Sequence, residues 1–250
     1  MSFLIDYASA QQIPVTLDGS AHEIIFDGKW SFRQEWKATT LDNEIYDDSH
    51  EMVIKTGHDY ENLYVLLDFV TKAQNFKDRA YVCVDNSIDR GIKPTVSTFC
   101  FTTAPDSQYP ITLQGGSPIE PTGFFAKIKN HPNFIAIEGI SDQNDRYSRN
   151  PHESYEFKIP IDVIGASDRY GFYVSVIDGN TGKSYNWPHL ATPDKYPYIP
   201  PPNLWGEIFS PDHSLPEFSL PFYILLSALL FSMIVGKMIE RKNLQIFNRF

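Results

Sequence analysis

The sequence predicts an all-β fold: an antiparallel β-sandwich of two sheets, followed by one C-terminal transmembrane helix. Short runs rich in Val, Ile, Tyr and Phe alternate with clusters of Gly, Pro, Asn and Asp, which is typical of strands joined by turns. Between residues 40 and 210 no segment keeps a helical period, although Asp162–Ser167 is expected to form one turn. Many short strands with frequent turns favour two packed sheets over an α/β fold.

The expected strands share a high content of β-branched and aromatic residues. They are Met52–Thr56, Asn62–Phe69, Arg79–Asp85, Thr98–Thr103, Phe134–Ile140, Tyr155–Ile161 and Tyr170–Asp178. The turn-forming residues of His58–Asn62 predict a hairpin loop between the first two strands. We expect one sandwich domain over residues 11–208, in which the proline-rich Tyr196–Pro202 is stiff and extended.

The two cysteines, Cys83 and Cys100, lie in two of these expected strands. If the strands pair, a cross-strand disulfide can form in an oxidising compartment. The alternative is two buried thiols that pack as small apolar side chains. Only the geometry distinguishes the two.

The final expected element is a membrane-spanning helix at 220–239. Residues 220–236 carry no charge, and Lys237 can extend its ammonium to the interface, so the span reaches the length of about 20 residues that a bilayer demands. Lys237, Arg241, Lys242 and Arg249 follow the span, whereas no Lys or Arg occurs in 196–221. The positive-inside rule therefore predicts a stalk at 209–219, a cytoplasmic tail at 240–250 and an extracytoplasmic large domain at the cell membrane.

Export of that domain requires a signal, and residues 1–10 end in Ala8-Ser9-Ala10, which has the small-residue pattern of a signal-peptidase site. We interpret residues 1–10 as the end of a signal peptide that begins upstream of this start. The alternative is an ordinary N-terminus on a cytosolic, tail-anchored domain. A native N-terminus at Gln11 would support export.

Charge and motif content exclude several classes of function. The net charge of −10 leaves no basic stripe to neutralise phosphates, which argues against nucleic acid as a partner. The sequence has no Gly-x-Ser-x-Gly, His-Glu-x-x-His or phosphate loop, so we expect a non-catalytic protein. Glu138 and Glu156 lie on expected strands, where solvated glutamates are far commoner than glycosidase pairs.

An ordered set of motifs resembles family 9 carbohydrate-binding modules and their DOMON-like relatives. The motifs cover residues 13–208: Ile25-Phe26-Asp27-Gly28 with Glu35-Trp36, then His58–Val65, Asp78–Asp85, Tyr155–Pro160, Gly171–Val174 and Trp205-Gly206. Pro216-Glu217-Phe218 also resembles the tripeptide that precedes the final membrane helix of archaeal surface proteins. The resemblance implies a β-sandwich of the jelly-roll or immunoglobulin-like kind. It also implies binding of a sugar, often with structural calcium, or of a haem in the wider DOMON group.

Sugar binding requires an aromatic ring for the apolar face of a pyranose and polar groups for its hydroxyls. Trp187 is the best stacking candidate, because Tyr185-Asn186-Trp187-Pro188-His189 has the composition of a loop with amide and imidazole groups nearby. Trp30, after Asp27-Gly28, is the second candidate. Packing of both rings beneath loops is the alternative. Trp36 and Trp205 lie in the recurring motifs and are expected in the core.

A cation site is the next candidate. Asp85, Asn86 and Asp89 place oxygen-bearing side chains on a turn that ends in Gly91, which suits calcium. The alternative is a turn stabilised by its own Asx side chains. Asp142–Asp145 is a weaker example of the same pattern.

Haem is the less favoured cofactor. The sequence has no Cys-x-x-Cys-His, which excludes covalent c-type attachment, and Met52 has the strand position of a core residue. The sequence as a whole favours a membrane-anchored extracytoplasmic module that binds a glycan or another small polar ligand. A haem domain in electron transfer and a purely structural surface protein are the alternatives.

Overall fold

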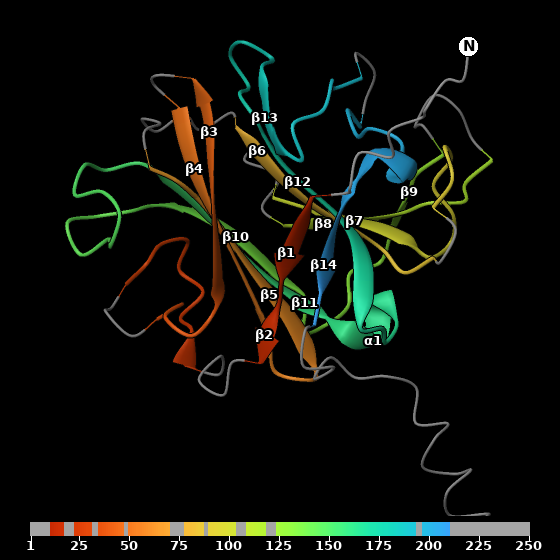
Figure 1. The fold of residues 1–250 in the computed structure, drawn as a ribbon, viewed down its shortest axis with the longest axis horizontal. Coiled ribbons are helices and arrows are strands. Elements are labelled where there is room, and N and C mark those ends of the chain that lie inside the picture. Colours follow the sequence, from red (N-terminus) through yellow and green to blue (C-terminus); the bar gives the residue numbers. More distant parts are fainter. Residues whose placement is uncertain are drawn as a thin grey trace, which may run out of the picture. The chain divides into compact units, whose positions relative to one another are not determined.

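Two β-sheets account for nearly all regular structure in the part of the chain that the computed structural model describes (Figure 1). The described residues are 11–17, 23–31, 35–47, 50–70, 78–87, 90–103, 109–118, 124–193 and 197–210. All of them fall within one compact unit, Met1–Pro216.

The first sheet has eight strands in the order β1-β14-β12-β6-β7-β8-β9, with β13 also paired to β12. Its strands are β1 (Gln12–Pro14), β6 (Arg79–Asp85), β7 (Thr98–Thr102), β8 (Ile111–Gln114), β9 (Ala126–Ile128), β12 (Arg169–Ile177), β13 (Ser184–Trp187) and β14 (Gly206–Phe209). We call it sheet A.

The second sheet, sheet B, has six strands in the order β10-β11-β5-β4-β2, with β3 also paired to β4. Its strands are β2 (Thr16–Leu17), β3 (Thr40–Asp47), β4 (His50–His58), β5 (Asn62–Phe69), β10 (Ile135–Ile140) and β11 (Glu153–Pro160). One short helix, α1 (Ile161–Ile164), and a 3-10 turn, Pro202–Leu204, complete the elements.

Each of the seven strands expected from the sequence is present, and α1 falls at the expected single turn. The expectation of purely antiparallel sheets is wrong at two edges, because β1 pairs with β14 and β2 pairs with β4 in parallel. Both pairs join an N-terminal segment to a strand that is distant in sequence, so no hairpin constrains their direction.

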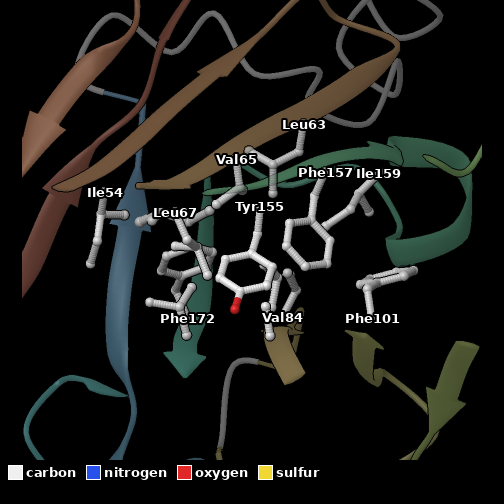
Figure 2. Close-up of a cluster of buried hydrophobic side chains, with 14 of the residues drawn as sticks. Ile54, Leu63, Val65, Leu67, Val84, Phe101, Tyr155, Phe157, Ile159 and Phe172 are labelled. Carbon is white, nitrogen blue, oxygen red and sulfur yellow. The ribbon is translucent and has the colours of Figure 1, made fainter. Parts of the chain in front are cut away.

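The main core lies between the two sheets. Alternate residues of each strand point inward, since successive side chains of a strand lie on opposite faces. Figure 2 shows inward side chains of sheet B facing those of sheet A: Leu63, Val65, Leu67, Tyr155, Phe157 and Ile159 against Val84, Phe101 and Phe172. Met52 is 0% exposed in this core, as its strand position predicted.

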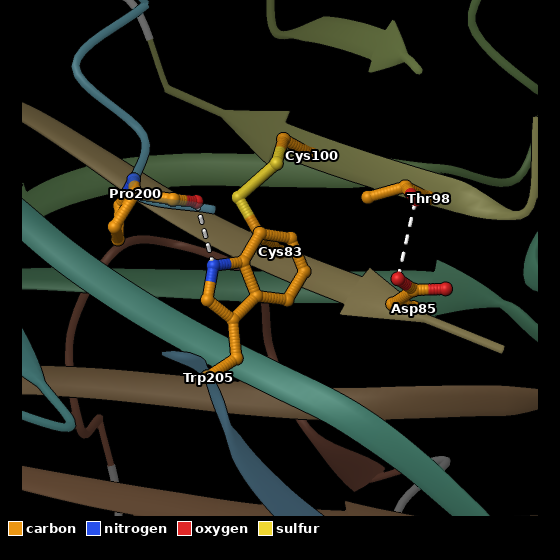
Figure 3. Close-up of a disulfide and its surroundings, with 6 residues drawn as sticks. All are labelled: Cys83, Asp85, Thr98, Cys100, Pro200 and Trp205. Carbon is orange, nitrogen blue, oxygen red and sulfur yellow. Dashed lines mark hydrogen bonds between the residues drawn. A yellow bond between two sulfur atoms is a disulfide. The ribbon is translucent and has the colours of Figure 1, made fainter. Parts of the chain in front are cut away.

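The outer face of sheet A carries a second, smaller core around a disulfide between Cys83 and Cys100. The two residues lie directly opposite each other on β6 and β7, with Cα atoms 4.0 Å apart. Trp205 packs in the same cluster and donates its indole N–H to the carbonyl of Pro200 (Figure 3). The structure therefore contains the cross-strand bond, the first of the two alternatives left open by the sequence.

The outer face of sheet B is covered by the segment that precedes β3. Trp36 is buried against this face and donates its indole N–H to Glu156 of β11 over 2.9 Å. The backbone N–H groups of Asp27 and Gly28 donate to the other carboxylate oxygen of Glu156. Trp36 and Trp205 are thus core residues, as expected, and Glu156 fastens this segment to the sheet.

The expected signal-peptide end (residues 1–10), most of the stalk and the membrane segment at 220–239 lie outside the described residues. Within the described ranges, no helix is long and apolar enough to span a bilayer.

Candidate functional site

A cavity of about 400 Å³ opens on the outer face of sheet A. Its floor is formed by Arg79 and Tyr81 of β6 together with Ile177, the last residue of β12. Its walls come from two loops, the turn at 178–182 and the segment that carries Thr192, Pro193 and Tyr198. A half-open hollow of this size is typical of a site for one small ligand.

Sheet register explains the floor. Arg79 and Ile177 are cross-strand partners, so their side chains lie side by side at the end where β6 begins and β12 ends. Arg79 also lies close enough to donate to the Tyr81 hydroxyl, at 3.4 Å from Nη1. The floor therefore combines a ring, an aliphatic side chain and a guanidinium.

The turn that forms one wall is held by carboxylates. Asp178 Oδ1 accepts from the backbone N–H groups of Asn180 and Thr181, and Asp78 Oδ1 accepts from that of Gly179. These bonds fix the loop at the edge of the cavity. The Asp178 carboxylate and the Arg79 guanidinium therefore line the same cavity. A ligand with several hydroxyl groups can use both as partners, because carboxylates accept and guanidinium groups donate.

Tyr198 also lines the cavity and is 37% exposed. Its backbone has φ of 66°, in the left-handed region that non-glycine residues seldom adopt. Residues held in this region are concentrated at ligand sites, where surrounding contacts fix the backbone. Tyr198 is thus a partly exposed aromatic residue of the kind expected at Trp187.

A second cavity, of about 390 Å³, lies next to α1 and is lined by Tyr60, His131 and Asp162 among others. His131 and Asp162 face each other across 3.3 Å. Tyr60 is 52% exposed and also left-handed, with φ of 70°. Tyr60 is therefore a counterpart to Tyr198: an exposed tyrosine with left-handed backbone that lines a different cavity.

The structure places Tyr185 and Trp187 in strand β13 rather than in the expected loop. Both point into the main core, with exposures of 3% and 1%. Tyr185 packs edge-on against Phe69, and Trp187 lies against Phe172. The expectation that the Trp187 ring faces solvent is corrected by this placement, because pairing with β12 directs both rings inward.

Asn186 points the opposite way, toward the outer face of sheet A. Its amide accepts from the Leu190 N–H and donates to the Leu190 carbonyl and to Thr192 Oγ1. These bonds hold the segment that carries Thr192 into the wall of the outer cavity. Asn186 is therefore positioned to support this cavity from beneath.

Trp30, the second stacking candidate, is 1% exposed on the outer face of sheet B. Tyr147 meets its ring edge-on, with centroids 5.9 Å apart, and the Lys55 ammonium lies 5.4 Å from the ring centroid. The ring is covered on this face and is remote in the fold from the sheet A cavity. The ligand-binding roles of Trp30, Tyr185, Asn186 and Trp187 stay predictions.

The candidate calcium turn is described in part, because Asp89 lies outside the described residues. Asp85 is buried, and its Oδ1 accepts from the N–H and hydroxyl of Ser87, while Oδ2 accepts from Thr98 (Figure 3). Asn86 donates to the carbonyl of Ile164. These contacts are those of an Asx-stabilised turn, and calcium here stays a prediction.

A third group of polar residues is buried on the outer face of sheet B: Asp68, Asp145 and His152. One potential ligand atom from each lies within 4.8 Å of the others. Burial raises the pKa of Asp68 to about 6, against the opposing effect of its hydrogen bond with His152. Burial lowers the pKa of His152, but Asp68 outweighs it and the pKa is raised.

The sequence alone did not reveal the cavity or this buried group. The residues that line the cavity come from two strands and two loops. Some of them, such as Arg79 and Tyr198, lie more than 100 positions apart in the sequence. Asp68 carried a detectable signal, since it is the one charged residue in the apolar run Leu63–Val70.

No family model and no curated protein matches this sequence. Solved structures do match in fold. A family 9 carbohydrate-binding module from Caldicellulosiruptor kristjanssonii, in complex with cellotriose, superposes with a TM-score of 0.50 at 14% identity, over 83% of this chain and 99% of that chain. The module in complex with glucose gives 0.49 at 14% identity, over 80% and 95%. The chain therefore has a β-sandwich similar to that of a family 9 carbohydrate-binding module.

Proposed function

We propose that this chain is a non-catalytic carbohydrate-binding module whose sugar site is the cavity on the outer face of sheet A. The observation that carries this proposal is the pairing of a partly exposed Tyr198 ring with Arg79 and Asp178 in one hollow. A pyranose needs an apolar surface for its C–H face and donors and acceptors for its hydroxyls, and this hollow offers all three.

The likeness in fold to a module in complex with cellotriose supports the class of ligand. Fold alone does not fix a ligand, and the argument for the site therefore depends on the residues of this chain. Segment 189–193, held through Asn186, would position the wall of the cavity before a sugar arrives. Such preorganisation reduces the entropy lost on binding.

The proposal includes the place where the module acts. An uncharged apolar segment at 220–236, followed by basic residues, supports an anchor with the sandwich on the extracytoplasmic side. The Cys83–Cys100 disulfide supports the same side, since such bonds persist in oxidising compartments.

The first test is whether the purified full chain, in detergent, binds glycans on an array that includes cello-oligosaccharides. Selective binding to at least one class of oligosaccharide is expected. An array on which no glycan is retained above a heat-denatured control would contradict the proposal. An absorption spectrum of the same sample tests the alternative cofactor, because a haem domain would show a Soret band.

A further inference from the structure

The buried group on sheet B is built from one strand and the loop that joins β10 to β11. Asp68 lies on β5, His152 immediately precedes β11, and Asp145 lies in the loop that joins β10 to β11. The neighbours Leu67 and Tyr155 point into the main core, so Asp68 and its cross-strand partner Ser154 point to the outer face. The loop then covers them from outside.

Burial of this group is nearly complete. Asp68 is 0% exposed, His152 is 1% exposed and Asp145 is 7% exposed. Two carboxylates at this depth are costly unless a cation or sufficient hydrogen bonds compensate their charge. The compensation that the described residues provide is incomplete, since Asp68 Oδ2, Asp145 Oδ2 and Ser154 Oγ have no hydrogen-bond partner.

The histidine is oriented as a metal ligand. Its Nδ1 lies 2.7 Å from the carbonyl oxygen of Asn150 and 2.7 Å from Ser141 Oγ. A carbonyl only accepts, so Nδ1 carries a proton. A metal ion that displaced the proton between Nε2 and Asp68 would therefore meet the Nε2 lone pair. Metal-binding histidines commonly donate their other N–H to a backbone carbonyl in this way.

The distances from Nε2 bracket those expected around a shared ion, and all three ligand atoms lie within 4.8 Å of one another. His152 Nε2 lies 2.7 Å from Asp68 Oδ1 and 3.9 Å from Asp145 Oδ2. In a tetrahedral site with bonds near 2.05 Å, ligand atoms are about 3.3 Å apart, between these two separations. An imidazolium in place of the ion would hydrogen-bond Asp68 Oδ1 and form an ion pair with Asp145 Oδ2 at 3.9 Å. It would still leave Asp68 Oδ2 and Asp145 Oδ2 without a hydrogen bond.

We propose that Asp68, Asp145 and His152 form a structural binding site for a divalent transition-metal ion of the zinc class. An imidazole nitrogen with two carboxylates suits zinc, whereas calcium takes six to eight oxygen ligands. The fourth position is open to a water, for which the Ser154 hydroxyl is a hydrogen-bond partner. The ion would fasten the loop at 141–151 to sheet B, and it is independent of the sugar site on sheet A.

Metal content and affinity test this site on the untagged full chain in detergent. We expect one zinc per chain by mass spectrometry after equilibration and desalting, and cobalt substitution should give the visible bands of a low-symmetry site. Added Zn²⁺ should raise the melting temperature of the chelated protein. Calcium at the same concentration should not compete.

Two variants keep the local shape while removing a charged ligand. Asp145→Asn retains the Oδ1 that accepts from the N–H groups of Tyr147 and Ser148. Asp68→Asn retains a side chain that can hydrogen-bond His152 Nε2 in either protonation state of the ring. Each should weaken zinc binding by at least about 100-fold, since even an outer-shell partner contributes 10- to 100-fold. His131→Ala, at the other described His–Asp pair beside α1, is the control and should bind zinc as the unchanged chain does.

Three outcomes would overturn the site: a wild-type chain without zinc affinity, calcium binding in place of zinc, or unchanged zinc affinity in Asp145→Asn. If Asp68→Asn is poorly folded by circular dichroism, Asp145→Asn alone decides, because its turn contacts are preserved.

Discussion

Gly206 lies directly beneath the ring of Trp187. A Cβ atom added at Gly206 would stand 2.5 Å from Cη2 and 2.7 Å from Cζ3 of Trp187, closer than real Cβ atoms approach a neighbour. The glycine of the Trp205-Gly206 motif is therefore required by packing: β14 passes β12 and β13 at a point where only a bare backbone leaves room for the indole.

We expect Gly206→Ala to destabilise the sandwich by about 1–3 kcal/mol, the usual cost of overpacking a core. Trp187→Phe should relieve part of that cost, because the smaller phenyl ring lacks Cη2 and Cζ3, the two indole atoms that would clash with the new Cβ atom. Chemical denaturation of both single variants and the double variant gives the coupling energy. Strict additivity would contradict the contact.

Loss of the disulfide is expected to destabilise the domain by about 3 kcal/mol, the loop-entropy value for a bond that closes a loop of roughly 17 residues. The measurement is the unfolding free energy of the Cys83→Ala/Cys100→Ala double variant. Both side chains are 0% exposed, so the loss will include a packing contribution. A double variant as stable as the parent would contradict a stabilising contribution from this bond.

Stability should fall as pH rises from about 4.5 to about 7 because of Glu138. Burial, with a smaller contribution from the charge of Glu153, raises the pKa of Glu138 from 4.5 to about 7. In this range the unfolded chain has released the proton that the folded chain retains, so raising the pH favours unfolding. The contribution of the protonated Glu138 carboxyl group to the free energy of unfolding is therefore fully present below pH 4.5.

Glu138→Gln should remove this component, so its melting temperature relative to the parent should rise between pH 4.5 and pH 7.5. Glu61→Gln, at an exposed carboxylate in the β4–β5 hairpin loop, is the control and should follow the parent. A Glu138→Gln profile parallel to that of the parent would contradict the assignment.

The membrane segment is tested on the full chain. We expect the protein to sediment with membranes and to resist alkaline carbonate extraction, while a chain that stops after Asp212 stays in the supernatant. The physical reason is the uncharged run at 220–236, which is long enough with the residues after it to span a bilayer. Recovery of the full chain in the carbonate supernatant would contradict the anchor.

The predicted strands are those whose residues alone favour extended backbone, such as Asn62–Phe69 and Arg79–Asp85. Strand β3 was not predicted because three of its eight residues are acidic and one is Asn, all of low strand propensity. It forms because β4 offers an adjacent edge with which it pairs over most of its length. Tertiary pairing thus overrides the local preference.

The place of the candidate sugar site could not be predicted from the sequence. The composition around Trp187 predicted aromatic and amide side chains at the site. In the structure, alternate residues of β13 point to opposite faces: Trp187 points into the core, and Asn186 points to the segment that lines the cavity. That alternation could not be assigned while 184–187 were interpreted as a loop. The exposed ring belongs to Tyr198, whose left-handed backbone leaves no signature in the sequence.

Calorimetric titration of the Tyr198→Ala and Tyr60→Ala variants with a cello-oligosaccharide tests the sugar site most directly. Both positions are partly exposed tyrosines with left-handed backbone, and each lines a different cavity. The substitutions therefore have comparable effects on the backbone and differ in place alone. Tyr198→Ala should weaken binding at least tenfold, a loss of about 1.4 kcal/mol, while Tyr60→Ala should bind as the parent does. Unchanged affinity in Tyr198→Ala, or loss of affinity in Tyr60→Ala instead, would contradict a carbohydrate site on the outer face of sheet A.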